Sequence, residues 1–181
     1  MSENALRDHF SAMARNSAWS NHRLLSACAK LTDAEFAQKR TSFFPSIQMT
    51  LNHNLIADHV YLADMTGVGR KNISLVGDVP YPKLPDLKKA QEAFDADLIA
   101  YCDKLTAADM NRIVPIEWHD DTVSQEPLHL VLSHLFVHQI HHRGQAHAML
   151  AGTNVPPPQL DEFFLNYDIP RRKGEPFTAR E

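Results

Sequence analysis

Cysteine is scarce in this sequence of 181 residues, which contains only Cys28 and Cys102. Two cysteines are too few for a disulfide framework, and they form no cluster of metal ligands, so we expect a reducing, cytoplasmic location. A basic surplus is also lacking, because 18 lysines and arginines stand against 22 aspartates and glutamates. The resulting net charge of -4 disfavours nucleic acid as a partner.

Long hydrophobic runs are absent as well. No stretch approaches the 18 uncharged apolar residues that a membrane-spanning helix needs, so no membrane partner is expected. The first residues, MSENALRDHF, have neither the basic region nor the continuous apolar region of a secretory signal. The length suits one domain over residues 1–181, with 44% hydrophobic residues to build its core.

Helical periodicity is present instead, because apolar residues recur at spacings of three and four over long segments. A first helix is predicted over about residues 4–31. A second is predicted from Ser46, as its N-cap, to Gly67. The segment from 67 to 85 is rich in glycine and proline and is predicted to be a long connection.

Two more long helices are predicted in the second half of the chain. One runs from residue 86 to about residue 105, and the other begins between residues 125 and 127 and ends at Ala151, before Gly152 and three prolines. Between them, residues 106–118 are expected to be irregular, with a short helical turn and an extended segment. A short helix around residues 160–166 and a polar tail complete an all-α four-helix bundle.

Histidine is abundant: the chain has 11, and six fall between positions 129 and 147. A helix advances about 100° per residue, so the direction of each can be compared with that of His138. His142 lies about 40° to one side, and His134 and His141 lie about 40° and 60° to the other. The remaining two of the six point to the opposite side of the helix: His129 and His147.

The second predicted helix carries one histidine, His53, on its apolar stripe, whereas His59 lies about 120° away. Buried imidazoles need partners, so each could be a core side chain bonded to a carbonyl or carboxylate. The pair His138 and His142, four residues apart, could instead bind one metal ion together with His53. Three nitrogen ligands are typical of an open catalytic metal site. Spacing alone leaves both interpretations open.

The segment HLFVHQIHHRGQAHAML, at residues 134–150, closely resembles the last-helix signature of the DinB family of metalloproteins, which is unrelated to the DNA polymerase of that name. Three further segments are similar to the family in the expected order. They are MARNSAWSNHRLL at 13–25, FFPSIQMTLNHNLIADHVYLADMTG at 43–67 and LDEFFL at 160–165. The resemblance therefore covers nearly the whole chain.

The resemblance implies an up-down-down-up four-helix bundle that forms a homodimer and holds a divalent metal ion, zinc or nickel. Carried over by position, the metal ligands are His53, His138 and His142. Val137 stands where many members have asparagine, and DHVY at 58–61 replaces a segment in which arginine and tryptophan are frequent. Neither change removes a ligand, although both alter the surroundings of the site.

A metal ion on three neutral imidazoles keeps an open position, where it can activate water or stabilise the thiolate of an incoming small thiol. The resemblance implies a metal-dependent enzyme for a small molecule, of the hydrolase or thiol S-transferase type. His134 and His141 are candidates for proton transfer or for supporting the ligands. A non-catalytic metal-binding or sensor dimer, and a structural dimer with hydrogen-bonded core histidines, are the alternatives.

Other residues have expected roles that the sequence leaves open. Metal-bound histidines usually donate their second N–H to a carboxylate or carbonyl, which Glu92, Asp95 or Asp97 could supply. Arg143 points away from the ligands, towards a neighbouring helix or a structural ion pair. The two tryptophans are interpreted as packing residues, and the second of them could line a pocket mouth: Trp19 and Trp118.

The second and fourth long helices are apolar on two sides, whereas a simple bundle buries only one side. The second apolar side of the fourth helix carries Phe136 and Ile140, and that of the second helix carries Leu51, Leu55 and Leu62. We expect these two surfaces to form the dimer interface.

Overall fold

Four long helices dominate the computed structural model, which describes residues 4–70, 73, 77–118, 120 and 122–178. These helices are α1 (Ala5–Cys28), α3 (Ile47–Thr66), α4 (Leu84–Lys104) and α5 (Leu128–Ala151). The shorter elements are α2 (Asp33–Ala37), the 3-10 turns η1 (Ala108–Asn111) and η2 (Asn166–Arg172), and the strands β1 (Ile113–Glu117) and β2 (Val123–Pro127). The described chain is therefore mainly helical, with one small sheet.

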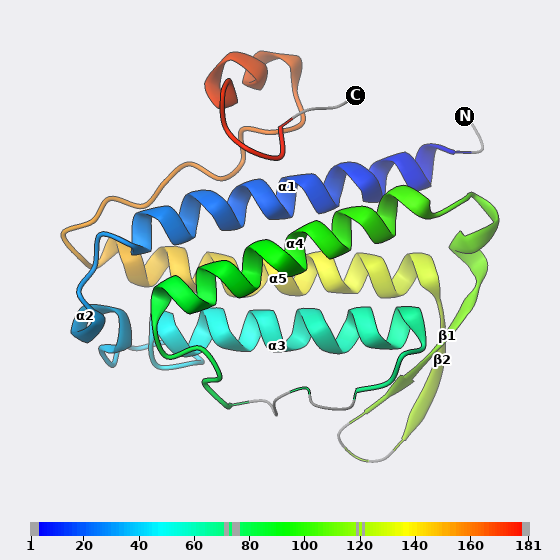
Figure 1. Ribbon diagram of the computed structural model, residues 1–181, viewed down its shortest axis with the longest axis horizontal. Helices are drawn as coiled ribbons and strands as arrows, with labels where there is room; N and C mark the ends of the chain where they lie inside the picture. Colours follow the sequence, from blue (N-terminus) through cyan, green and yellow to red (C-terminus); the bar gives the residue numbers. More distant parts are fainter. Residues whose placement is uncertain (1–3, 71–72, 74–76, 119, 121, 179–181) are drawn as a thin grey trace.

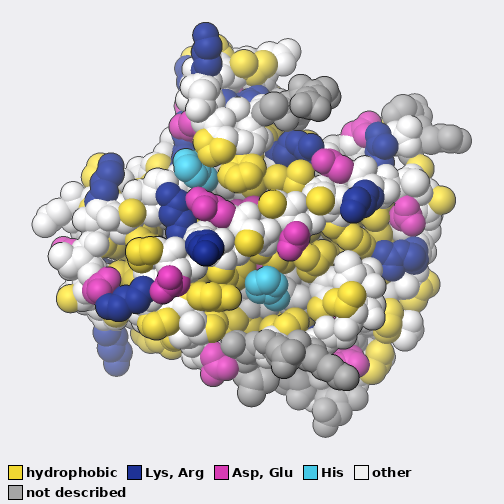
Figure 2. Space-filling model, viewed as in Figure 1, with side chains coloured by type: hydrophobic (Ala, Val, Ile, Leu, Met, Phe, Trp, Pro, Cys, Tyr) yellow, Lys and Arg dark blue, Asp and Glu magenta, His cyan; other side chains and the backbone are white. Residues whose placement is uncertain are grey.

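The four long helices lie side by side (Figure 1). α1 packs against α4 and α5, and α3 packs against the same two helices. In Figure 1, α1 and α5 run towards the left, and α3 and α4 run towards the right. No helix in the described ranges is long and apolar enough to cross a membrane. On the face in Figure 2, basic and acidic side chains are interspersed rather than gathered by sign.

The ends of the long helices follow the local signals in the sequence. The Ser46 hydroxyl accepts a hydrogen bond from the Met49 amide at 3.1 Å, and Gly67 ends α3 with a φ of 72°. Gly152 is the C-cap of α5, as predicted. α4 begins two residues earlier than predicted because Pro85 is tolerated in the first turn of a helix. The connection after α3 includes residues 71–72 and 74–76, which lie outside the described residues.

An antiparallel hairpin joins α4 to α5, and only its first strand lies in the segment predicted to be extended. β2 occupies residues 123–127, and α5 begins at Leu128, one residue after the range predicted for the start of the last helix. The backbone of this polar segment pairs with β1, with Gln125 opposite Pro115 and Glu126 opposite Val114. Pairing with β1, the preceding strand of the same hairpin, therefore outweighs the weak local helical pattern.

Two short elements also differ from the predictions. The five-residue α2 is too short for a periodicity signal, although Thr32 and Glu35 form a capping box at its start. No helix covers residues 160–166; the 3-10 turn η2 begins at Asn166 instead. Contacts with α1 hold this segment, because Phe163 packs against Trp19 at 5.6 Å between ring centroids and Ser20 donates to a backbone carbonyl.

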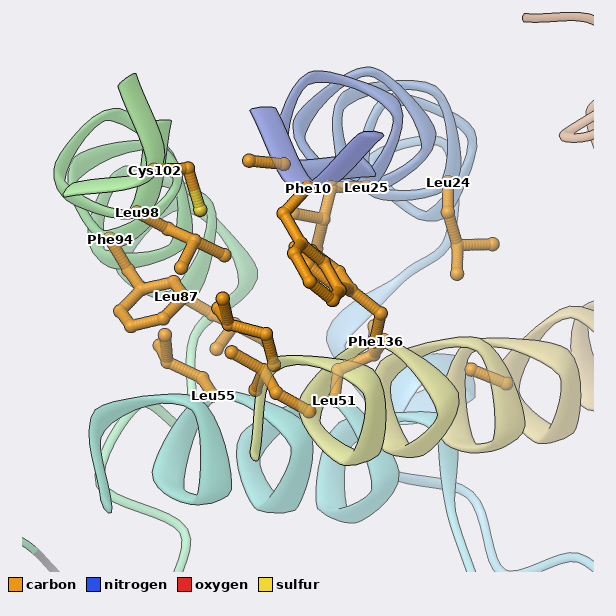
Figure 3. Packing of buried hydrophobic residues seen from close by; sticks show 14 of the residues in the cluster. Phe10, Leu24, Leu25, Leu51, Leu55, Leu87, Phe94, Leu98, Cys102 and Phe136 are labelled. Carbon is orange, nitrogen blue, oxygen red and sulfur yellow. The ribbon is translucent and has the colours of Figure 1, made fainter. Parts of the chain in front are cut away.

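Three of the five side chains on the second apolar sides of α3 and α5 lie in the core of the single chain, which corrects the predicted dimer interface at these positions. Leu51 and Leu55 point towards α4, and Phe136 stacks on Phe10 of α1 with ring centroids 6.2 Å apart (Figure 3). These side chains are buried because α3 and α5 each pack against more than one element. Leu62 is partly buried, and Ile140 is 50% exposed.

The variant Phe136→Ala separates a core role from an interface role. We expect it to lower the free energy of unfolding by about 3–5 kcal/mol, because it removes a buried aromatic ring and leaves a cavity. The control Ile140→Ala, one turn further along α5, should change it by less than about 0.5 kcal/mol. Urea unfolding at two protein concentrations measures both. A loss for Phe136→Ala that disappeared on dilution would point back to an interface.

Candidate metal centre

Three histidines from two helices meet at one point in the structure. His53 comes from the middle of α3, and His138 and His142 come from successive turns of α5. Their ligand nitrogens all lie within 4.8 Å of one another. The Nε2 atoms of His53 and His138 are 3.2 Å apart. The structure therefore brings together the three residues that helix geometry and the family resemblance had predicted as ligands.

The separation of the nitrogen atoms fits a small divalent cation. Two ligands on tetrahedral zinc lie about 3.3 Å apart when each Zn–N distance is about 2.0–2.1 Å. The distance of 3.2 Å between the Nε2 atoms of His53 and His138 is close to this value. A neutral imidazole has one nitrogen with a lone pair that can bind a metal ion. This donor set of three nitrogens is compatible with metal binding.

Hydrogen bonding selects the metal-binding tautomer of His142. Its Nδ1 donates to Oε1 of Gln145 at 2.8 Å, which leaves the Nε2 lone pair free. The Gln145 amide in turn donates to Nε2 of His141 at 3.0 Å. His141 is exposed and supports a ligand through Gln145 rather than belonging to the set of three.

The predicted carboxylate partners from α4 do not reach the ligands. Among the described residues, Nδ1 of His53 and Nδ1 of His138 have no hydrogen-bond partner. Asp95 is buried in a different network, and Asp97 is exposed on α4. The partner that the sequence did not predict is the side-chain amide of Gln145. It lies three residues after His142 and four residues after His141 on the same helix.

Aromatic rings flank the three histidines and reduce their contact with water. Phe44 stacks on His53 with centroids 4.1 Å apart, and Tyr61 lies 6.4 Å from His138. Burial, together with the charge of neighbouring imidazoles, lowers the pKa of His53 to about 4 and the pKa of His138 to about 3. Burial also lowers the pKa of His142. The imidazoles are therefore neutral at pH 7, the form that binds metal.

The other histidines of interest have separate surroundings. His134, one turn before His138, is exposed and lies 5.4 Å from the Tyr61 ring. His59 packs against Phe94 of α4 and, as its angle predicted, does not join the cluster of three. The two that point away from the ligands bond to backbone carbonyls at 2.9 Å: His129 to Met110 and His147 to Pro158.

A closed ring of hydrogen bonds lies beside the histidines, in the centre of the bundle. All seven of its side chains are buried, and all four long helices contribute: Ser17 and Asn21 (α1), Asp58 (α3), Gln91 and Asp95 (α4), Gln139 and Arg143 (α5). Gln139 donates to Asp58 at 2.9 Å and accepts from Ser17 at 2.7 Å. Arg143 donates to Ser17 and to Asn21, both at 3.0 Å.

The other half of the ring joins two carboxyl groups. Gln91 donates to Asp58 at 3.3 Å and to Asp95 at 3.1 Å, and Asn21 donates to Asp95 at 3.0 Å. Burial raises the pKa of Asp58 and the pKa of Asp95 to about 7 each, against the hydrogen bonds that they accept. Two carboxyl groups face the single cation of Arg143, so holding a proton on one of them balances the charge.

This ring, which we call the polar ring, fixes α5 in rotation and register. Gln139 directly follows His138, and Arg143 directly follows His142, so each ligand has a ring member as its neighbour. A rotation of α5 that moved the ligands would leave several buried polar groups unpaired. Sequence reasoning placed Arg143 towards a neighbouring helix, which is confirmed, but did not find its partners because they come from distant segments.

These features define a mainly helical protein with a three-histidine cluster. A sequence model of the DinB family matches residues 1–172, and the chain belongs to the DinB family. A solved structure, a DinB-like protein from Bacillus cereus ATCC 10987, is similar with a TM-score of 0.62 and 18% identity. The match covers 78% of this chain and 90% of that chain, and it supports the fold alone. No curated protein matches the chain.

The variant Asp58→Asn tests the protonation of the polar ring. A carboxyl group whose pKa is raised on folding stabilises the protein at low pH and loses this effect as the pH rises through the folded-state pKa. We expect the stability of the wild type, relative to Asp58→Asn, to fall by roughly 2–4 kcal/mol between pH 4 and pH 7. Chemical unfolding at several pH values measures it.

The exposed carboxyl group of Asp97 provides the control. The free energy of unfolding of Asp97→Asn should follow that of the wild type over the whole pH range. The histidines contribute equally to all three proteins, so their effect cancels in the comparison. A constant difference between the wild type and Asp58→Asn would show that Asp58 has the same charge in the folded and unfolded states.

Proposed function

We propose that this protein is a metal-dependent enzyme that acts on a small molecule by hydrolysis or thiol transfer. His53, His138 and His142 would hold the ion, zinc or nickel, and the observation that carries the proposal is their convergence with nitrogens within 4.8 Å. Their lowered pKa values support it, because neutral imidazoles bind metal without competition from protons.

The bound ion would supply a Lewis acid that lowers the pKa of a coordinated water molecule or thiol. The chain's own residues prepare the site for it. Phe44 shields His53 from water, and the Gln145 amide orients His142. Three protein ligands of this kind leave a position for a further ligand, as in catalytic sites. His134 and Tyr61, which lie beside His138, are in place to contact a substrate.

The Nδ1 atoms of His53 and His138 are buried and have no hydrogen-bond partner among the described protein atoms. His141 contacts the site through Gln145 and is in place to exchange protons with solvent. The polar ring keeps the backbone of α5 fixed during any such transfer. This arrangement combines a rigid ligand set with exposed histidines at its edge.

A homodimer stays a prediction of the family resemblance. Leu51, Leu55 and Phe136 cannot form its interface because they lie in the core. The exposed apolar side chains on α5 are an alternative surface: Leu130, Val137 and Ile140.

Elemental analysis of tag-free protein tests the ligand set. After incubation with zinc or nickel and dialysis, we expect about one ion per wild-type chain. His53→Ala and His138→Ala should each lose it, because two imidazoles bind a divalent ion far more weakly than three do. Inductively coupled plasma mass spectrometry gives the stoichiometry, and circular dichroism checks the fold.

His134→Ala is the matched control, since it removes an imidazole from the same helix one turn before His138. This variant should retain the full amount of metal. A wild-type chain that held no zinc and no nickel would contradict the proposal and favour histidines with a packing role.

Thiol binding separates an enzyme from a non-catalytic metal protein. We expect 2-mercaptoethanol added to the cobalt-substituted protein to produce a thiolate charge-transfer band in the near ultraviolet, because the fourth position is open. The band should be absent in His138→Ala. A cobalt spectrum that was unchanged by the thiol and by small carboxylates would indicate a closed site and favour a metal carrier or sensor.

A further inference from the structure

A cavity of about 220 Å³ lies between the β1–β2 hairpin and the helices α3 and α5. Its wall includes aromatic, aliphatic and charged side chains: Tyr61, Ile116, Trp118, Glu126, Val131 and His134. Complete pockets for drug-sized ligands have volumes of about 300–1,000 Å³. This cavity is smaller, so it suits one group of a substrate rather than a whole molecule.

The alternation of the strands places a carboxylate on the inner side of the hairpin. Val114 and Ile116 are buried, so their face of β1 is turned towards the helices. Glu126 is directly opposite Val114 in the register and therefore shares this inner face. Glu117 lies on the other face of β1 and is exposed. Among the described residues, Glu126 forms no ion pair, although it lines the cavity.

The aromatic side chains of the cavity are held in place. Trp118 continues the inner face of β1, and its indole Nε1 donates to the Ser124 hydroxyl at 2.9 Å. The Tyr61 ring comes from α3, on the other side of the cavity. Aromatic faces and a carboxylate are the groups that recognise an organic cation, through cation–π attraction and charge neutralisation.

The cavity adjoins the three histidines. Tyr61 lies 5.4 Å from His134, a residue of the cavity wall, and 6.4 Å from His138, a residue of the metal centre. His134 and His138 are one helical turn apart, which is a rise of about 6 Å. A group bound in the cavity would therefore lie within a few bonds of the metal centre.

We infer that this cavity binds a cationic organic group, an amine or a quaternary ammonium, that forms the non-reacting part of the substrate. The inference rests on the proposed function for the reacting part. Glu126 neutralises the charge of the ammonium group, and Trp118 and Tyr61 contact the carbon skeleton. The part of the substrate that carries the reacting bond extends past Tyr61 to the metal centre. The substrate class is thus a small molecule with an ammonium group a few bonds from its reactive group.

Binding of benzylamine, compared with neutral benzyl alcohol, tests the inference at pH 8. Trp118 is 39% exposed and Trp19 is fully buried, so tryptophan fluorescence reports on the cavity. We expect the wild type to bind benzylamine more tightly than benzyl alcohol. Glu126→Gln should weaken benzylamine binding about tenfold because a charged hydrogen bond is lost. The affinity for benzyl alcohol should not change. Glu117→Gln, on the outer face of the same hairpin, should behave like the wild type.

Two further variants separate this inference from the proposed function. His138→Ala should lose zinc and keep its benzylamine binding, and Glu126→Gln should keep zinc. Trp118→Phe should still bind benzylamine, as measured by ligand-observed NMR, but without the change in tryptophan fluorescence. This variant tests the location of the cavity even if Glu126→Gln does not fold. Equal affinity of the wild type for benzylamine and benzyl alcohol would overturn the inference, whatever the zinc content. Selective benzylamine binding in a wild type without zinc would support the cation site and contradict the metal enzyme.

Discussion

The arrangement of this protein depends on the polar ring in the centre of its bundle. Seven buried side chains from all four long helices close a circuit of hydrogen bonds, in which Gln91 links two carboxyl groups and Arg143 links back to α1. An apolar core tolerates exchange among side chains of similar volume, whereas a buried polar group that loses its partner costs about 1–3 kcal/mol. The ring therefore determines how the helices are aligned, and the apolar core fills the space around it.

The three-histidine centre takes its geometry from this alignment. On α5 the ligands and the ring members alternate in pairs, with His138 beside Gln139 and His142 beside Arg143. One face of the helix is thus fixed by hydrogen bonds, and the adjacent face presents imidazoles to His53 of α3. The polar ring contains the buried charged groups, whereas burial keeps the three histidines neutral. Charged and neutral titratable groups therefore lie on neighbouring sides of α5.

The sequence was sufficient for the features that depend on local spacing. Ser46 and Gly67 mark the ends of α3, and the 100° advance per residue brings His138 and His142 to one side of α5. Features that depend on pairing between distant segments were not predictable in this way. The ring, for example, joins Ser17 to Gln139, which are 122 positions apart in the sequence. The sequence showed that the helices carrying Leu51 and Phe136 have a second apolar face. It could not show that other helices of the same chain cover that face.

The hairpin differs from the bundle in how it is built into the fold. It stands between α4 and α5 at one end of the helices, and its members take no part in the polar ring (Figure 1). Its inner face closes the cavity beside the histidines, while the ligands themselves come from α3 and α5. On the proposed function, substrate recognition and metal binding would belong to separate parts of the chain. A change of substrate would then require new side chains at only a few alternate positions of two short strands, with the helical framework left intact.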